Sequence, residues 1–205
     1  MHPNPAYRTA SRETNLAFAR ERGFGTLMVS GIEGPLASHV PFLISEDGSM
    51  LETHLVRSNP IVPVLPAKAL VAIQGPDGYV SPDWYGVEDQ VPTWNYVAVH
   101  LRGALELRPS AELHDLLDRQ SAYFEATLRP KPPWTTDKMP ADLMERMMRA
   151  IVPCRMRIGD VQGTWKLTQN KPDAVRLSAA EQLRVHGPGL EAAWLADLMR
   201  DAGET

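Results

Sequence analysis

The sequence contains a single cysteine, Cys154, among its 205 residues. An intramolecular disulfide and a CxxC metal site both need more than one thiol, so neither can form within this chain. Apolar residues surround Cys154 in a segment that reads as a strand. We therefore interpret it as a small buried residue rather than as a catalytic thiol.

Long apolar runs and an excess of positive charge are also absent. No run approaches the length that crosses a bilayer, and Met1–Pro5 lacks the basic and then apolar pattern of a signal peptide. We therefore expect a cytoplasmic protein without membrane association. The formal net charge of −4 argues against strong sequence-independent binding to nucleic acid, although a local basic patch stays open.

Several functional motifs are missing as well. The six histidines form no recognisable metal triad, so we expect no metal site. No glycine-rich dinucleotide fingerprint is present, and no helix shows the basic face or the pattern of a helix-turn-helix. These absences exclude the common dehydrogenase and DNA-reading motifs, and leave the function to other features.

The most informative stretch that is present runs from Val91 to Gly103. It begins with a proline-containing turn that carries Thr93, Trp94 and Asn95, and continues as an alternating strand. Valine and leucine at every second position, from 97 to 101, are typical of a half-buried strand. A turn rich in aromatic and amide groups beside a rigid strand suits a flat polar ligand.

The remaining pattern predicts an α+β protein with an antiparallel barrel of about seven strands. Other strands are expected at 24–30, 36–44, 50–56, 70–74 and 151–158, with glycine-rich turns at 31–34, 75–78 and 159–160. Helices are expected from Ser11 to Arg22, after Pro109, after Pro140, where Leu143, Met144 and Met147 read as core, and from Ser178 to Thr205 with a break at Gly187–Gly189. We place a domain boundary after residue 172, with 173–205 as a C-terminal helical extension.

Polar clusters follow several of the predicted strands. They are His54 with Arg57, Ser58 and Asn59; Ser81 with Asp83, Trp84 and Tyr85; Thr93 with Trp94 and Asn95; and Lys166 with Thr168, Gln169, Asn170 and Lys171. A short helix after Asn59 is expected to offer free backbone N–H groups to an anion. Together the clusters suit a ligand with one phosphate and one aromatic ring system. Each cluster alone is more often turn and capping chemistry.

In their order along the chain, these stretches resemble the PaiB family of FMN-binding transcriptional regulators. The matching segments are Thr26–Ser30, Ser38–Phe42, His54–Pro60, Tyr79–Tyr85, Val91–Gly103 and Lys166–Lys171. The departures are mild, and the one that matters is Asp83, which adds negative charge near a site for an anionic cofactor.

This resemblance implies a split β-barrel, similar to the pyridoxamine-phosphate oxidase-like flavoproteins, with peripheral helices. It also implies a homodimer with FMN at the interface, held by residues from the polar clusters. Arg57 is our first choice for the phosphate. Lys166 is a candidate for the phosphate or for the flavin pyrimidine, where positive charge favours the reduced ring.

The resemblance leaves the activity open. A flavin-dependent transcriptional regulator or redox sensor, with a DNA or protein partner, is the first hypothesis. An FMN-dependent oxidoreductase acting on an unknown small molecule is the alternative, although no residue stands out as a general acid. A haem-binding split barrel is a weaker third possibility.

Overall fold

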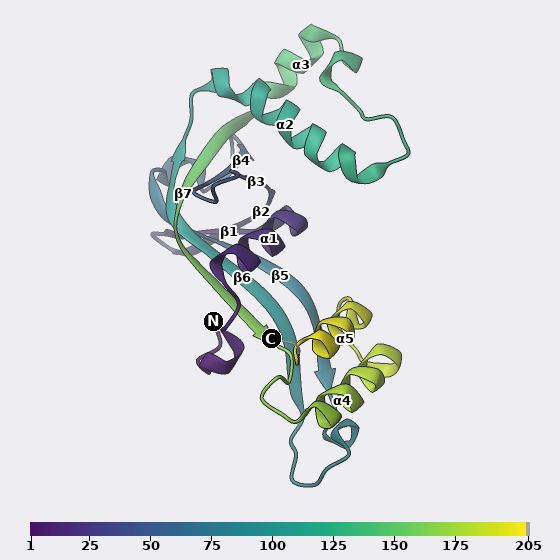
Figure 1. Ribbon diagram of the computed structural model, residues 1–205. Coiled ribbons are helices and arrows are strands. Elements are labelled where there is room, and N and C mark those ends of the chain that lie inside the picture. The colour runs from purple at the N-terminus through teal and green to yellow at the C-terminus, as the bar shows by residue number, and fades with distance from the viewer. Residues whose placement is uncertain (204–205) are drawn as a thin grey trace. The chain divides into compact units, whose positions relative to one another are not determined.

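The computed structural model describes residues 1–203, which contain seven strands joined in one sheet (Figure 1). The strands are β1 (Phe24–Gly31), β2 (Gly34–Pro41), β3 (Leu43–Ile44), β4 (Met50–Val56), β5 (Ala67–Val80), β6 (Thr93–Leu107) and β7 (Ile151–Lys166). Their order in the sheet is β2-β1-β5-β6-β7-β4-β3. The helices are α1 (Arg12–Arg22), α2 (Leu113–Glu125), α3 (Ala141–Met148), α4 (Asp173–His186) and α5 (Ala192–Asp201). The predicted α+β class is confirmed.

The chain divides into two compact units. The first unit contains Met1–Phe18, Ile73–His100 and the chain from Gln162 onward, and the second contains Ala19–Ala72 and Leu101–Val161. Each unit has an apolar core of its own, with Val97, Leu195 and Met199 buried in the first and Leu51 and Met156 buried in the second. The boundary that we predicted after residue 172 remains a prediction.

In the second unit, one predicted strand is divided into two. The segment 36–44 is interrupted at Phe42, which is buried and donates its N–H to the carbonyl of Gly23. Before this break, β2 pairs with β1 over the full hairpin; after it, β3 pairs with β4. Because β2 and β3 stand at opposite ends of the strand order, the break lets one chain segment serve both edges, as barrel corners require.

Two predicted turns lie inside continuous strands. Gly75–Gly78 belongs to β5, and Gly159–Asp160 belongs to β7. Gly75 is needed for close packing, because a Cβ atom there would lie 2.9 Å from Cβ of Val97 and 2.6 Å from the Phe18 ring. At Gly75, glycine is therefore needed because neighbouring segments pack closely, and not because the chain turns there.

The helices were predicted more accurately in position than in burial. Ser11 caps α1 by accepting a hydrogen bond from the N–H of Thr14, and Gly23 follows the helix with a φ of 57°. The apolar stripe of α3 was expected in the core, yet no α3 residue is buried and Met147 is 55% exposed. Helical periodicity identifies an apolar face but does not show that another segment covers it.

The C-terminal tail forms α4 and α5, with the predicted break between them. The predicted helical end at Thr205 lies outside the described residues. The guanidinium of Arg176 is buried and donates to the carbonyls of Met199 and Arg200 at the end of α5, and to Asp173. These bonds satisfy carbonyls that a helix leaves unpaired at its C-terminus. Every helix among residues 1–203 is too short or too polar to span a bilayer.

Candidate functional site

The first polar cluster lies in the second unit, where β4 ends. Arg57 is exposed, and its guanidinium donates from Nε to the carbonyl of Arg149 at 3.0 Å and from Nη2 to that of Ile151 at 3.3 Å. Its backbone N–H donates to the carbonyl of Ala150. These contacts fix the guanidinium beside the start of β7 and leave it open to solvent, as an anion contact requires.

Asn59 and Ser58 complete the loop after Arg57. Asn59 donates from Nδ2 to the hydroxyl of Ser38 at 3.0 Å, and its Oδ1 accepts the N–H of Ile61 at 2.9 Å. The N–H of Val62 is bonded to the carbonyl of Asn59. The expectation of free backbone N–H groups is therefore wrong at Ile61 and Val62, because the side chain and the carbonyl of Asn59 accept these two N–H groups. The helix that follows is a 3-10 helix of only three residues. Ser58 is exposed.

His54 lies on β4, between the buried residues Thr53 and Leu55. Burial lowers the pKa of His54, and a hydrogen bond with Gln120 opposes the shift only in part. Its Nδ1 atom is buried and has no hydrogen-bond partner among residues 1–203. A bound ligand could provide the hydrogen bond that this buried ring nitrogen lacks.

The second cluster lies in the first unit, where β6 begins and β7 ends. The ammonium of Lys166 donates to the hydroxyl of Thr93 and, at 2.8 Å, to the carbonyl of Trp94. Burial lowers the pKa of Lys166. Its nitrogen also lies 6.0 Å from the centre of the Tyr7 ring. Strand β6 starts at Thr93, within the segment that we expected to be a turn.

Trp94 and Asn95 have opposite environments, as neighbours in a strand do. Trp94 is 50% exposed and packs edge-on against Tyr79. Asn95 is fully buried; it donates to the hydroxyl of Thr168 at 2.7 Å and to the sulfur of Met199 at 3.3 Å, while its Oδ1 has no partner among residues 1–203. Trp94 thus presents a ring to solvent, whereas Asn95 supports the strand from inside.

The turn after β7 is held by its own side chains. Gln169 accepts the N–H of Leu167 at 2.8 Å and donates to the carbonyls of Trp165 and Ala6. Asn170 accepts the hydroxyl of Tyr7 at 3.0 Å. Because the side-chain oxygen and nitrogen of Gln169 are both hydrogen-bonded within the protein, this amide shapes the turn that carries Lys166.

Sequence reasoning placed Thr168 in this cluster, without its strain, and missed Tyr7. Thr168 has a φ of 64°, which is costly for a β-branched residue, and its hydroxyl accepts from Asn95. Tyr7 contacts both Lys166 and Asn170, although it is far from them in the sequence. The segment 166–171 signalled a turn, but no local pattern shows strain or links residue 7 to it.

Ser81 and Cys154 make none of the contacts described for these two clusters. Ser81 precedes the 3-10 helix Pro82–Tyr85, and its side chain makes no capping bond there. Cys154 is 1% exposed in β7, and burial raises its pKa to about 12. The interpretation of Cys154 as a structural strand residue is therefore confirmed.

Comparison with known proteins identifies a family and a fold. Residues 1–160 match the family described as "Putative FMN-binding domain". The chain is 31% identical over 199 residues to protease synthase and sporulation protein PAI 2 of Bacillus subtilis, covering 95% of this chain and 94% of that protein. An uncharacterized protein of Emericella nidulans, AN0679, is 25% identical over 87% of this chain and 88% of its own length.

Solved structures with the same fold have little sequence in common with this chain. The FAD and heme binding protein of Mycobacterium smegmatis has a TM-score of 0.55 at 18% identity, covering 78% of this chain and 73% of that one. The conserved hypothetical protein Rv2991 of Mycobacterium tuberculosis has a TM-score of 0.57 at 14% identity, covering 83% and 94%. These similarities confirm the predicted split-barrel fold.

Proposed function

Because the chain belongs to the PaiB-like FMN-binding family, we propose that it is a redox sensor whose bound FMN controls a regulatory interaction. The observation that carries the proposal is the match with PAI 2 over nearly the full length of both proteins. The name of that relative links it to sporulation. A sensor needs only that the cofactor be held in an environment that depends on its redox state.

In this proposal Arg57 binds the phosphate of FMN. Its exposed guanidinium is anchored by two carbonyls, so little side-chain freedom is lost on binding. The neighbouring Ser58 and Asn59 supply hydroxyl and amide groups, and His54 has a buried nitrogen without a partner among residues 1–203. These groups fit a dianion, which is best bound by one firm cation and several hydrogen-bond donors.

The phosphate assignment is tested with FMN and riboflavin, which share the ring but differ in the phosphate. Arg57→Ala should weaken FMN binding by about 1.5–3 kcal/mol, because a charge-assisted contact is lost. Riboflavin binding should change little. Quenching of flavin fluorescence by the apoprotein measures both affinities, and Arg129→Ala, which removes an exposed cation after α2, serves as the control. Equal losses for both flavins would place Arg57 outside the phosphate site.

We assign the flavin ring to the cluster around Thr93 and Trp94 in the first unit of either copy of the homodimer that the resemblance implies, with Ser81 and Asn170 as further contacts. The exposed Trp94 ring offers a stacking surface, and Asn95 and Gln169 hold the strand and turn behind it. When bound, FMN supplies the redox chemistry. Lys166 provides the positive charge that favours the reduced flavin, since its ammonium is held by Thr93 and Trp94.

Anaerobic titration separates a sensor from an enzyme. The affinity of the FMN-loaded protein for a promoter fragment or protein partner should differ between the oxidised and reduced forms, measured at stated salt. Lys166→Gln should make the midpoint potential of bound FMN more negative. Rapid repeated oxidation of NADH or NADPH, with no redox-dependent binding, would instead support the FMN-dependent oxidoreductase.

A further inference from the structure

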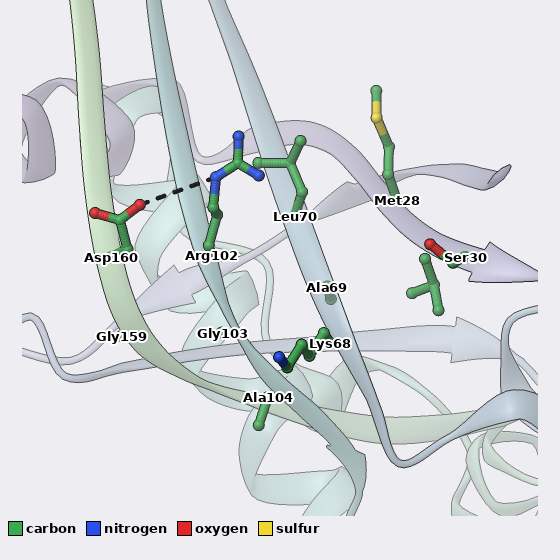
Figure 2. A pocket seen from close by; sticks show the side chains of 11 residues that line it. Met28, Ser30, Lys68, Ala69, Leu70, Arg102, Gly103, Ala104, Gly159 and Asp160 are labelled. Atoms are coloured by element: carbon green, nitrogen blue, oxygen red, sulfur yellow. Dashed lines mark ion pairs between the residues drawn. The ribbon is translucent and has the colours of Figure 1, made fainter. Parts of the chain in front are cut away.

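A groove of about 560 Å³ lies in the second unit, on four strands that are neighbours in the sheet (Figure 2). Its lining residues come from β1, β5, β6 and β7, and none of them is a residue that we predicted for FMN. The volume is within the range of small-molecule sites. The groove is therefore large enough for a ligand of its own.

Glycine and alanine form part of the groove floor. Gly103 cannot carry a side chain, because a Cβ atom there would lie 1.8 Å from the carbonyl oxygen of Arg157. At Gly159, by contrast, the nearest atom to an added Cβ is the carbonyl oxygen of Arg102 at 3.9 Å. Ala104 adds only a methyl group. Between the longer side chains of the lining, these positions leave a floor of backbone and methyl groups.

The charged side chains along the groove are incompletely neutralised. Lys68 is exposed, and within residues 1–203 its ammonium has no ion pair or hydrogen bond. Arg102 approaches Asp160 with a nitrogen to oxygen distance of 3.9 Å, and both side chains are about half exposed, at 46% and 49%. Such a pair is worth little in water and exchanges readily. Two cations and one carboxylate leave the groove positive.

We propose that this groove binds a small organic anion that has a flat apolar body and a single carboxylate or similar acidic group. Lys68 receives the anionic group, and Arg102 contributes a second donor by turning from Asp160. The apolar body lies on the floor of glycine and alanine, beside the side chains of Met28 and Leu70. Burial of a flat apolar surface supplies affinity, and the cations select an acid over a neutral compound.

The test uses 1-naphthoate as the probe and 1-naphthamide as its neutral analogue. Isothermal titration of the FMN-loaded protein, with the cofactor site filled, should give saturable binding of one naphthoate per chain. The affinity for the amide should be at least about tenfold lower than that for naphthoate, because the amide lacks the charge. Absence of saturable naphthoate binding, or equal binding of the amide, would overturn the proposal.

Variants then locate the binding. Lys68→Gln should weaken naphthoate binding about tenfold, and Gly159→Val should abolish it by filling the groove where space is available. Arg146→Gln, which removes an exposed cation from α3, should leave the affinity unchanged. Circular dichroism checks that each variant is folded. Unchanged naphthoate affinity in Lys68→Gln would overturn the assignment even if Gly159→Val did not fold.

Discussion

Individual glycines in this chain have different surroundings, although their local sequences predict the same kind of turn. Gly75 and Gly159 both occur where the sequence predicts a turn, and both lie within strands. Gly75 is enclosed by Phe18 and Val97, while the nearest atom to a Cβ at Gly159 is 3.9 Å away. The difference comes from neighbours that are distant in the chain, so the local sequence cannot reveal it.

The two glycines should therefore respond differently to the same change. Gly75→Ala should lower the free energy of unfolding by about 1–3 kcal/mol, because the new methyl group overlaps a packed ring and backbone. Gly159→Ala should be neutral or slightly stabilising, since space is available and the unfolded chain loses freedom. Urea unfolding measures both. Equal effects would mean that the packing around Gly75 adjusts at little cost.

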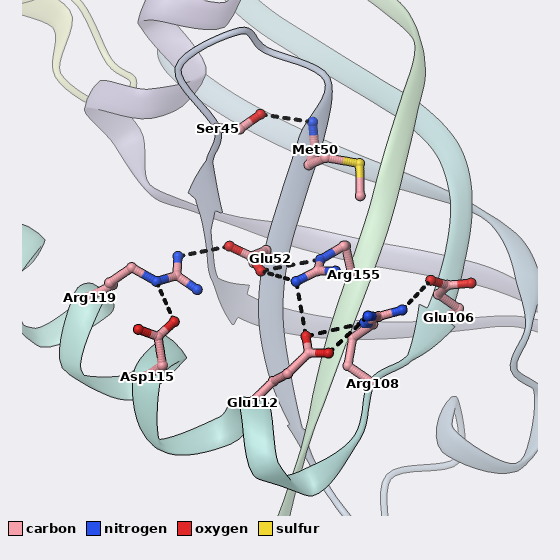
Figure 3. A network of polar contacts seen from close by, with 9 residues as sticks. All are labelled: Ser45, Met50, Glu52, Glu106, Arg108, Glu112, Asp115, Arg119 and Arg155. Carbon is pink, nitrogen blue, oxygen red and sulfur yellow. Dashed lines mark hydrogen bonds and ion pairs between the residues drawn. The ribbon is translucent and has the colours of Figure 1, made fainter.

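At the scale of elements, α2 is tied to the sheet by a network of ion pairs (Figure 3). Glu52 on β4 accepts from Arg119 of α2 at 2.8 Å and from Arg155 of β7 at 2.8 Å. Arg155 also donates to Glu112, just before α2. Burial of Glu52 acts to raise its pKa, but the hydrogen bonds from the two arginines prevail and hold it below its ordinary value.

This network should stabilise the protein in a pH-dependent way. Because the folded pKa of Glu52 lies below the ordinary 4.5, its contribution is present above that pH and is lost as the pH falls through the folded pKa. Glu52→Gln should therefore cost about 1 kcal/mol at pH 7, after allowance for solvent screening, and the cost should shrink in acid. Urea unfolding at several pH values gives the comparison.

Glu106→Gln is the matched control for the Glu52 variant. Among residues 1–203 the side chain of Glu106 pairs only with Arg108, and it is 53% exposed. Its replacement should have a smaller effect at pH 7. A loss as large as that of Glu52→Gln would show that the position within the network does not matter.

The elements also show how far the sequence leads. Alternating residues predicted strands at the positions of β1, β4, β5, β6 and β7, and one strand over β2 and β3 together. The caps predicted α1. These signals arise within a few residues. The split at Phe42 and the length of β5 were not predicted, since both depend on contacts with remote segments. For the same reason the position of Arg57 at a strand end was predicted, but its bonds to Arg149 and Ile151, more than ninety residues away, were not.

At the scale of the whole molecule, we propose that two copies form a homodimer with FMN at their interface. The exposed apolar side chains of α3, such as Met147, are consistent with a surface that a second copy covers. A cofactor bound between two copies contacts the dimer and not the separate chains. Its binding and the association of the chains must then reinforce each other.

This coupling can be measured by sedimentation velocity over a range of protein concentrations. The FMN-loaded protein should remain dimeric at lower concentrations than the apoprotein, because FMN stabilises only the associated form. In Arg57→Ala the difference should shrink at limiting FMN, where the variant is incompletely loaded, and return at saturating FMN. Arg129→Ala, which removes an exposed cation after α2, should behave like the unmodified protein. An FMN-loaded monomer at micromolar concentration would instead mean that one chain holds the cofactor alone.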